Sequence, residues 1–237
     1  MKLTFLGTKG YVEESSSKHR YHSSLLLEYR NFRLLIDHGL LSKKLRTLNP
    51  GAILITHGHP DTFKWLKENE EYAGKIYVTS ETKKLSRFPQ NFVLLKLNRW
   101  LDLGPFKVLA YRVVHSVLAP AVGFKIKAGK TLIYNSDLVV PKNKAILNDV
   151  DLYIGDGSSV RGNLVRKKNG QLFGHARIST QLRWCQQYGI KKVIFTHFGK
   201  EALRIGDKRL TEMLQKKFPQ KGLKIMLAYD GWSYNLL

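Results

Sequence analysis

The sequence of 237 residues contains one cysteine and no long apolar run. With Cys185 alone an internal disulfide bond is impossible, and packing is a more common role for such a residue than nucleophilic catalysis. No segment approaches the roughly 20 consecutive apolar residues that cross a bilayer. The apolar stretch at the N-terminus is too short for the hydrophobic region of a signal peptide. These features predict a soluble, cytoplasmic protein that does not bind membranes.

Internal divisions are also absent from the sequence. It has no low-complexity segment, no long repeat and no linker rich in Pro, Gly or Ser. A chain of this length can bury a substantial core without help from disulfides or a metal. We therefore expect residues 1–237 to form a single domain.

Acidic residues are scarce relative to basic ones. There are 18 Asp and Glu against 40 Lys and Arg, which gives a formal net charge of +22. A solvated, Lys-rich surface can carry such a charge for solubility alone. An imbalance this large nevertheless favours a polyanionic partner, of which nucleic acid is the commonest. The charge therefore predicts a nucleic-acid partner, with a merely solvated surface as the alternative.

The pattern of apolar residues predicts an α/β protein. Strands are expected over residues 2–6, 24–29, 32–36, 52–56, 75–79, 93–95, 106–114, 122–126, 131–134, 152–154, 193–195 and 224–228. Helices are expected over 62–72, after an N-cap at Ser80, over 179–188 with Gly189 as C-cap, and over 210–218. Residues 163–171 are expected to form a polar loop. The order of these elements indicates packed sheets covered by helices.

His or Asp repeatedly follows the end of an apolar strand. This occurs at His57, His59 and Asp61, at His115, at Asp137 and at His197. Strand ends at one edge of a sheet converge on a cleft. Zinc-like ions bind imidazole nitrogen and carboxylate oxygen. Because packing gives no reason for two His and an Asp at alternate positions, the first of these groups predicts a metal centre.

The motif His57-Gly58-His59-Pro60-Asp61 resembles the HxHxDH signature of the metallo-β-lactamase-fold hydrolases. The similarity continues in order through Asp37 in LLIDHG, His115, YNSDL, FTHFG and AYDG at residues 228–231. It implies a four-layer αββα sandwich that binds one or two Zn²⁺ or Mn²⁺ ions per chain. The implied ligands are His57, His59 and His115 for the first metal, Asp61 and His197 for the second, and Asp137 as the bridge.

One position departs from the signature, because its final histidine is replaced by Thr62. A threonine hydroxyl is a poor zinc ligand. The second site could be weaker, could use water in the gap, or could be lost so that one metal remains. His38 or His175 could instead substitute for the missing ligand. Asp61 would then matter more as the group that orients or deprotonates the attacking water.

Three further segments resemble the ribonuclease Z branch of phosphodiesterases. They are LGTKG at residues 6–10, the polar loop ending in His22-Ser23-Ser24, and Gly174-His175-Ala176 before a predicted helix. The resemblance implies that His175 is a catalytic residue at the scissile phosphate, as proton donor or phosphate ligand. There is no clear long insertion like the tRNA-gripping arm of true ribonuclease Z, which argues against tRNA 3′ processing.

Basic side chains flank these motifs and are candidates for substrate binding. Arg166, Lys167 and Lys168 precede His175, and Lys200 follows His197. Such groups neutralise phosphates in nucleic-acid complexes. The leading hypothesis is a metal-dependent phosphodiesterase, a nuclease that acts on DNA or RNA through a metal-activated water. The alternatives are a hydrolase of a small phosphodiester, cyclic phosphate or lactone, and a non-catalytic nucleic-acid-binding module with a degraded metal site.

Overall fold

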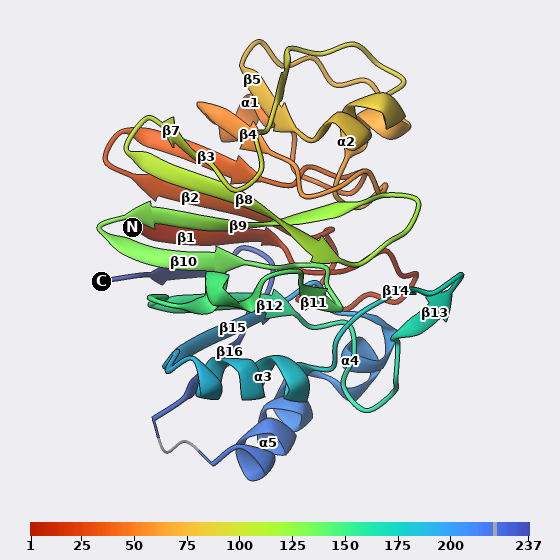
Figure 1. The fold of residues 1–237 in the computed structure, drawn as a ribbon, viewed down its shortest axis with the longest axis vertical. Coiled ribbons are helices and arrows are strands. Elements are labelled where there is room, and N and C mark those ends of the chain that lie inside the picture. The colour runs from red at the N-terminus through yellow and green to blue at the C-terminus, as the bar shows by residue number, and fades with distance from the viewer. Residues whose placement is uncertain (220–221) are drawn as a thin grey trace.

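Two large β-sheets lie face to face in the computed structural model, which describes residues 1–219 and 222–237 (Figure 1). The first sheet has the strand order β17-β1-β2-β3-β4-β5-β6. Its strands are β1 (Lys2–Gly7), β2 (Ser24–Tyr29), β3 (Phe32–Ile36), β4 (Ala52–Leu54), β5 (Lys75–Val78), β6 (Phe92–Leu94) and β17 (Ser233–Asn235).

The second sheet has the order β11-β8-β9-β10-β12-β15-β16, with β7 paired to β8. Its strands are β7 (Trp100–Leu103), β8 (Phe106–Val114), β9 (Ala121–Ala128), β10 (Lys130–Tyr134), β11 (Val140–Pro141), β12 (Leu152–Asp156), β15 (Lys192–Thr196) and β16 (Lys224–Leu227). In both sheets the strands that lead to the predicted ligands run parallel to one another, as in β3-β4-β5 and β10-β12-β15. Their carboxyl ends therefore share one edge.

Helices cover the outer face of each sheet (Figure 1). The first sheet carries α1 (Leu45–Leu48), the 3₁₀ turn η1 (Lys64–Leu66) and α2 (Ser80–Leu85). The second sheet carries η2 (Lys144–Leu147), α3 (Ile178–Gln187), α4 (Lys200–Ile205) and α5 (Asp207–Lys217). A separate hairpin consists of β13 (Arg166–Lys168) and β14 (Gln171–Phe173). No helix in the described part of the chain is long and apolar enough to cross a membrane.

Alternation along the strands explains the layers. On β3, Leu34 and Ile36 point into the cluster between the two sheets, whereas Leu35 packs outward against the residues of α1 and η1. On the other sheet, Ile133 of β10 packs in the same cluster as Cys185 of α3, beneath α3 and α5. Strands buried on both faces require helices on both outer faces. The predicted four-layer αββα sandwich is thereby confirmed.

Three local predictions are wrong. Residues 62–72 form only the short turn η1, because Lys64 N donates to the carbonyl of His38 at 2.7 Å rather than continuing a helix. The cap of α2 is Thr79 rather than Ser80, since the Thr79 side chain accepts from Thr82 N. The expected polar loop over 163–171 contains β13 and the turn to β14, with positive φ at Asn169 and Gly170 as a two-residue hairpin turn requires.

Candidate metal centre

The predicted ligands are delivered by strand ends from both sheets. His57 and His59 follow β4, His115 follows β8, Asp137 follows β10, and His197 follows β15. Because β8 and β10 are both antiparallel to β9, they run in the same direction and end at the same edge. The convergence of these residues is thus a property of strand direction.

Three imidazoles form the first group of candidate ligands. His57 Nε2 lies 2.9 Å from His59 Nδ1, and His115 Nε2 lies 3.5 Å from the same atom. Ligands bound at the usual zinc–nitrogen length in a tetrahedron are about 3.3 Å apart. The three nitrogens therefore have the spacing that one ion needs.

The far nitrogen of two of these rings is held by the protein. His57 Nδ1 contacts the hydroxyl of Thr56 at 2.9 Å, and that hydroxyl donates to the carboxylate of Asp37 at 2.9 Å. His115 Nδ1 lies 3.1 Å from the carbonyl oxygen of Gly174, which can only accept. Both partners favour a proton on Nδ1 and leave Nε2 with a free lone pair for a metal. Burial lowers the pKa of both histidines, which also favours their neutral form.

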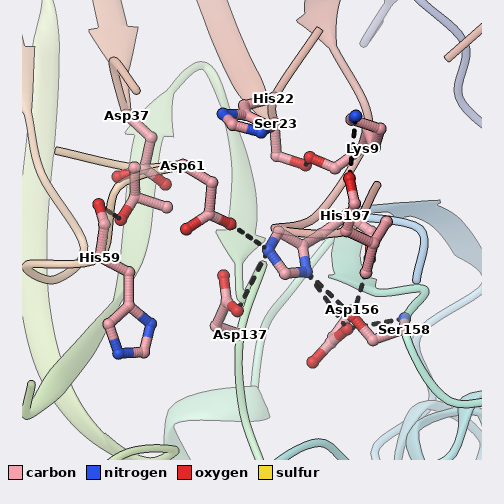
Figure 2. Close-up of polar contacts among 12 residues, drawn as sticks. Lys9, His22, Ser23, Asp37, His59, Asp61, Asp137, Asp156, Ser158 and His197 are labelled. Atoms are coloured by element: carbon pink, nitrogen blue, oxygen red, sulfur yellow. Dashed lines mark hydrogen bonds and ion pairs between the residues drawn. The ribbon is translucent and has the colours of Figure 1, made fainter. Parts of the chain in front are cut away.

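A second group surrounds His197, whose position is drawn in Figure 2. Its Nε2 lies 2.9 Å from Asp61 Oδ2 and 3.2 Å from Asp137 Oδ1. Burial lowers the pKa of His197, but the negative charge of Asp137 and the other carboxylates outweighs burial and raises that pKa well above its usual value. Without a metal, this histidine is therefore the cation that balances the buried carboxylates.

Two buried carboxylate oxygens in the described part of the chain lack the partner that a bound metal ion could provide. Asp61 Oδ1 and Asp137 Oδ2 have no hydrogen-bond partner among the residues that the structure describes. Leaving ionised oxygens buried and unpaired costs free energy, which a cation can offset. With three imidazoles beside them, these oxygens complete a donor set suited to zinc-like ions.

Thr62 does not fill the position of the missing histidine. Its side chain is fully buried and its hydroxyl donates to the carbonyl oxygens of His57 and His59, at 3.1 and 3.3 Å. The hydroxyl therefore stabilises the local turn from His57 to Thr62. His38 is also engaged elsewhere, because its Nε2 lies 2.9 Å from Glu70 Oε2. Of the two proposed substitutes, only His175 is near the site, with Nδ1 3.9 Å from Asp137 Oδ1.

Asp156 is a site residue that sequence reasoning did not nominate. Its Oδ2 lies 2.7 Å from His175 Nδ1, and its Oδ1 accepts from Ser158 N at 2.8 Å. Gln181 of α3 holds its backbone on both sides, accepting from Asp156 N at 3.0 Å and donating to Asp156 O at 2.8 Å. The available signal was its place at the end of β12, the same placement that marked Asp137.

The two charges of this pair stabilise each other. Burial raises the pKa of Asp156, but the charge and hydrogen bond of His175 outweigh it and hold that pKa below its usual range. Burial lowers the pKa of His175, and Asp156 in turn raises it above the usual value. The pair therefore keeps a proton on His175 at higher pH than a free imidazole would.

The site opens into a cavity of about 830 Å³. Its wall includes Asp61, His175 and His197, and Lys200 lies at its rim. A smaller hollow of about 290 Å³ brings Arg166 beside His59, His115 and His175. Lys167 and Lys168 are exposed on the hairpin and line neither space. Of the predicted basic residues, Lys200 and Arg166 therefore line these spaces, and Lys167 and Lys168 do not.

Comparisons with known proteins bear on the fold of the chain. No protein-family model matches the chain, and no curated protein matches it. Solved structures do match: the metallo-β-lactamase fold protein YhfI from Bacillus subtilis has 17% identity and a TM-score of 0.70, with 98% of each chain covered. This chain has the metallo-β-lactamase fold.

Other structures with this fold match over similar lengths. The short form of human tRNase Z has 17% identity and a TM-score of 0.66, with both chains covered completely. A diphosphatase of the PhnP family has the same identity and TM-score, with coverage of 100% of this chain and 98% of the other. The predicted resemblance to metallo-β-lactamase-fold proteins, ribonuclease Z among them, is confirmed at the level of the fold.

Proposed function

We propose that this protein is a metal-dependent hydrolase that cleaves phosphodiester bonds in nucleic acid. The observation that carries the proposal is the meeting of three imidazoles, two unpartnered buried carboxylate oxygens and the His175–Asp156 pair at one cavity. The first two features suit divalent cations, and the third supplies a proton donor beside them. The net charge of +22 favours a polyanionic substrate.

The candidate ligands divide into two groups. One ion would be held by His57, His59 and His115, and a second by Asp61, Asp137 and His197. When bound, Zn²⁺ or Mn²⁺ supplies Lewis-acid stabilisation of phosphoryl charge and lowers the pKa of the attacking water. Thr62 contributes no ligand, so the second group has three protein donors.

The protein's own residues account for the other requirements of the reaction. His175 has its Nδ1 bound to Asp156, so Nε2 is the nitrogen left to face a substrate in the cavity. Protonated at Nε2, it would donate a proton to the leaving oxygen as the bond to phosphorus breaks. Asp61 Oδ1 is free to orient or accept a proton from the attacking water. Both roles are general acid–base catalysis at a positioned side chain.

A combined metal and substrate screen tests the proposal. Purified protein is analysed for bound metal, and then assayed with added Mn²⁺ or Zn²⁺ on single-stranded and double-stranded DNA and RNA beside bis-p-nitrophenyl phosphate. We expect metal-dependent cleavage that EDTA abolishes and that His59→Gln with Asp137→Asn removes. Asp102→Asn, which changes an exposed aspartate away from the cavity, is the matched control. Full cleavage by the double variant in EDTA would refute the proposal.

A small phosphodiester, cyclic phosphate or lactone is a second candidate substrate. Two observations favour it: Lys200 and Arg204 at the cavity rim both contact Glu14 Oε1, at 3.0 and 3.1 Å, and the same wall includes Val12 and Leu164. Two cations held by one carboxylate, beside apolar side chains, suit a small, partly apolar ligand. Cleavage of a nucleic acid should depend strongly on salt, whereas cleavage of a small ester should not.

A further inference from the structure

The hairpin β13–β14 projects from the body of the molecule at the end where the site lies (Figure 1). Arg166 pairs with Phe173, Lys167 with Leu172, and Lys168 with Gln171. The turn residues Asn169 and Gly170 have φ values of 48° and 78°, as the tightest hairpin turns require. The element is therefore a regular arm whose first strand is entirely basic.

The base of this arm is part of the candidate metal centre. Gly174, which follows β14, donates its N–H to the carbonyl of His115 at 2.7 Å, and its own carbonyl contacts His115 Nδ1. Its φ of +108° suits glycine, and a Cβ there would collide with the carbonyl oxygen of Leu164. His175 is the next residue. The arm is thus fixed directly to one candidate ligand and to the candidate proton donor.

The cations of the arm make no ion pair within the described residues, unlike Lys200 and Arg204 of α4. No ion pair within residues 1–219 and 222–237 includes Arg166, Lys167 or Lys168. All three side chains are exposed. Lys200 and Arg204, on the α4 side, share Glu14. Unpaired cations are the ones that can bind phosphates and release counterions.

We propose that the β13–β14 hairpin is a docking arm for single-stranded nucleic acid, which it holds so that one phosphate reaches the cavity. This inference rests on the proposed function and names its substrate class. Arg166 lines the hollow beside His59 and His175, so it would contact phosphate nearest the scissile bond. Lys167 and Lys168 would contact the strand farther along. Leu172, 44% exposed on β14 opposite Lys167, offers apolar surface to an unpaired base.

The depth of the site selects an unpaired strand over a duplex. His115, Asp137 and His197 are only 5%, 5% and 3% exposed, so a phosphate must enter the cavity to meet them. A stiff duplex cannot bring one phosphate inward without large deformation, whereas a single strand can. The arm would therefore guide a flexible chain into a recessed centre.

Binding by metal-free protein tests the docking arm directly. A fluorescein-labelled single-stranded oligonucleotide of about 12 nucleotides, as DNA or RNA, is titrated in EDTA at several salt concentrations and followed by anisotropy. The test variant is Lys167→Ala with Lys168→Ala. The matched control is Lys216→Ala with Lys217→Ala, two exposed lysines at the end of α5. A duplex of the same length is measured beside the single strand.

We expect the hairpin variant to weaken binding by about tenfold and to reduce the salt slope by about 1.4, which is ~0.7 for each lost contact with a single strand. The α5 control should bind like the wild type. The duplex should bind more weakly than the single strand. Equal losses in both variants, an unchanged salt slope in the hairpin variant, tighter binding of the duplex, or no binding by the wild type would each overturn the inference.

The docking arm and the proposed function can fail separately. The wild type is assayed in parallel for metal-dependent hydrolysis of bis-p-nitrophenyl phosphate. Loss of oligonucleotide binding in the hairpin variant without any hydrolysis by the wild type would keep the arm and reject the hydrolase. Hydrolysis by the wild type with identical binding curves for all variants would reject the arm and keep the hydrolase.

Discussion

His175 Nδ1 lies 2.7 Å from Asp156 Oδ2, and Asp156 is completely buried. The carboxylate therefore fixes which nitrogen of His175 faces the cavity, and it raises the pKa of that imidazole. Asp156 itself acts through His175 and is a positioning residue. The pair links the end of β12 to the segment before α3, two parts of the chain 19 residues apart.

Asp156→Asn should slow cleavage of nucleic acid by about 10²–10⁴-fold, the range of general acid catalysis. It should have a much smaller effect on bis-p-nitrophenyl phosphate, whose leaving group needs no proton. The direction of the pH dependence also follows. A proton donor is active only when protonated, so activity falls as pH rises through the pKa of His175. Removing the negative charge lowers the pKa of His175, so this fall should occur at lower pH in the variant.

A pH–rate profile on both substrates measures these effects. Asp102→Asn, at an exposed position, is the control for loss of an aspartate. An equal loss on both substrates with an unshifted profile would instead indicate that Asp156 serves only the stability of the fold.

Asp137→Asn should separate the contribution of a buried ion pair from the benefit of a bound ion. Asp137 Oδ2 has no partner within the described residues, but Asp137 Oδ1 lies 3.2 Å from His197 Nε2, so the metal-free variant loses an ion pair and should unfold at a lower temperature than the metal-free wild type. With Mn²⁺ or Zn²⁺ at about 100 times its Kd, the wild type should gain about 2.7 kcal/mol. The variant should gain far less. Thermal unfolding with and without metal, together with the amount of bound metal per chain, measures both the metal-free stability and the stabilisation by metal. Equal stabilisation of the two proteins by metal would exclude Asp137 as a ligand.

Thr62→Val should leave the bound metal per chain unchanged, because the hydroxyl is used by the carbonyls of His57 and His59. Loss of these bonds should lower the free energy of unfolding by about 1 kcal/mol. Thr62→Ser retains the hydroxyl and should recover most of that loss. Urea unfolding and metal analysis of both variants test this assignment, and a valine variant that binds less metal would identify Thr62 as a ligand.

Particular residues show how far sequence reasoning reaches. The sandwich and the meeting of His57, His59, His115, Asp137 and His197 were predictable, because apolar strands end at each of them and their order resembles a known signature. Asp156 was missed, since an Asp-Gly pair after a strand reads equally well as a turn. The hairpin was read as a loop although Asn169-Gly170 is a hairpin signal, because Arg166–Lys168 lacks the alternation of a half-buried strand.

The wrong helix over residues 62–72 has a tertiary cause. Phe63 and Trp65 are both buried, although their two-residue spacing would place them on opposite faces of a helix, and the segment is held by bonds to distant residues. Glu70 accepts from Leu45 N at 2.7 Å and also contacts His38 and Lys64. Such long-range partners cannot be read from local periodicity, and they replace the hydrogen bonds of a helix.

Glu70→Gln should therefore change how stability depends on pH. Burial raises the pKa of Glu70, but the hydrogen bonds from His38, Leu45 N and Lys64 outweigh burial and lower it from 4.5 to about 2. A carboxylate with a depressed pKa stabilises the fold fully above its unfolded value and loses that contribution as pH falls toward 2. Glu70→Gln lacks this charge-dependent stabilisation. After allowance for solvent screening, we expect a deficit of about 1–2 kcal/mol in its free energy of unfolding relative to the wild type near pH 7.

Urea unfolding at a series of pH values between about 7 and 3 measures this deficit. The difference between wild type and Glu70→Gln should stay constant down to the unfolded pKa of 4.5 and shrink below it. Glu71→Gln changes the exposed neighbour and should show little difference at any pH. A deficit of the same size throughout the series would mean that Glu70 acts through its shape and neutral hydrogen bonds, and not through its charge.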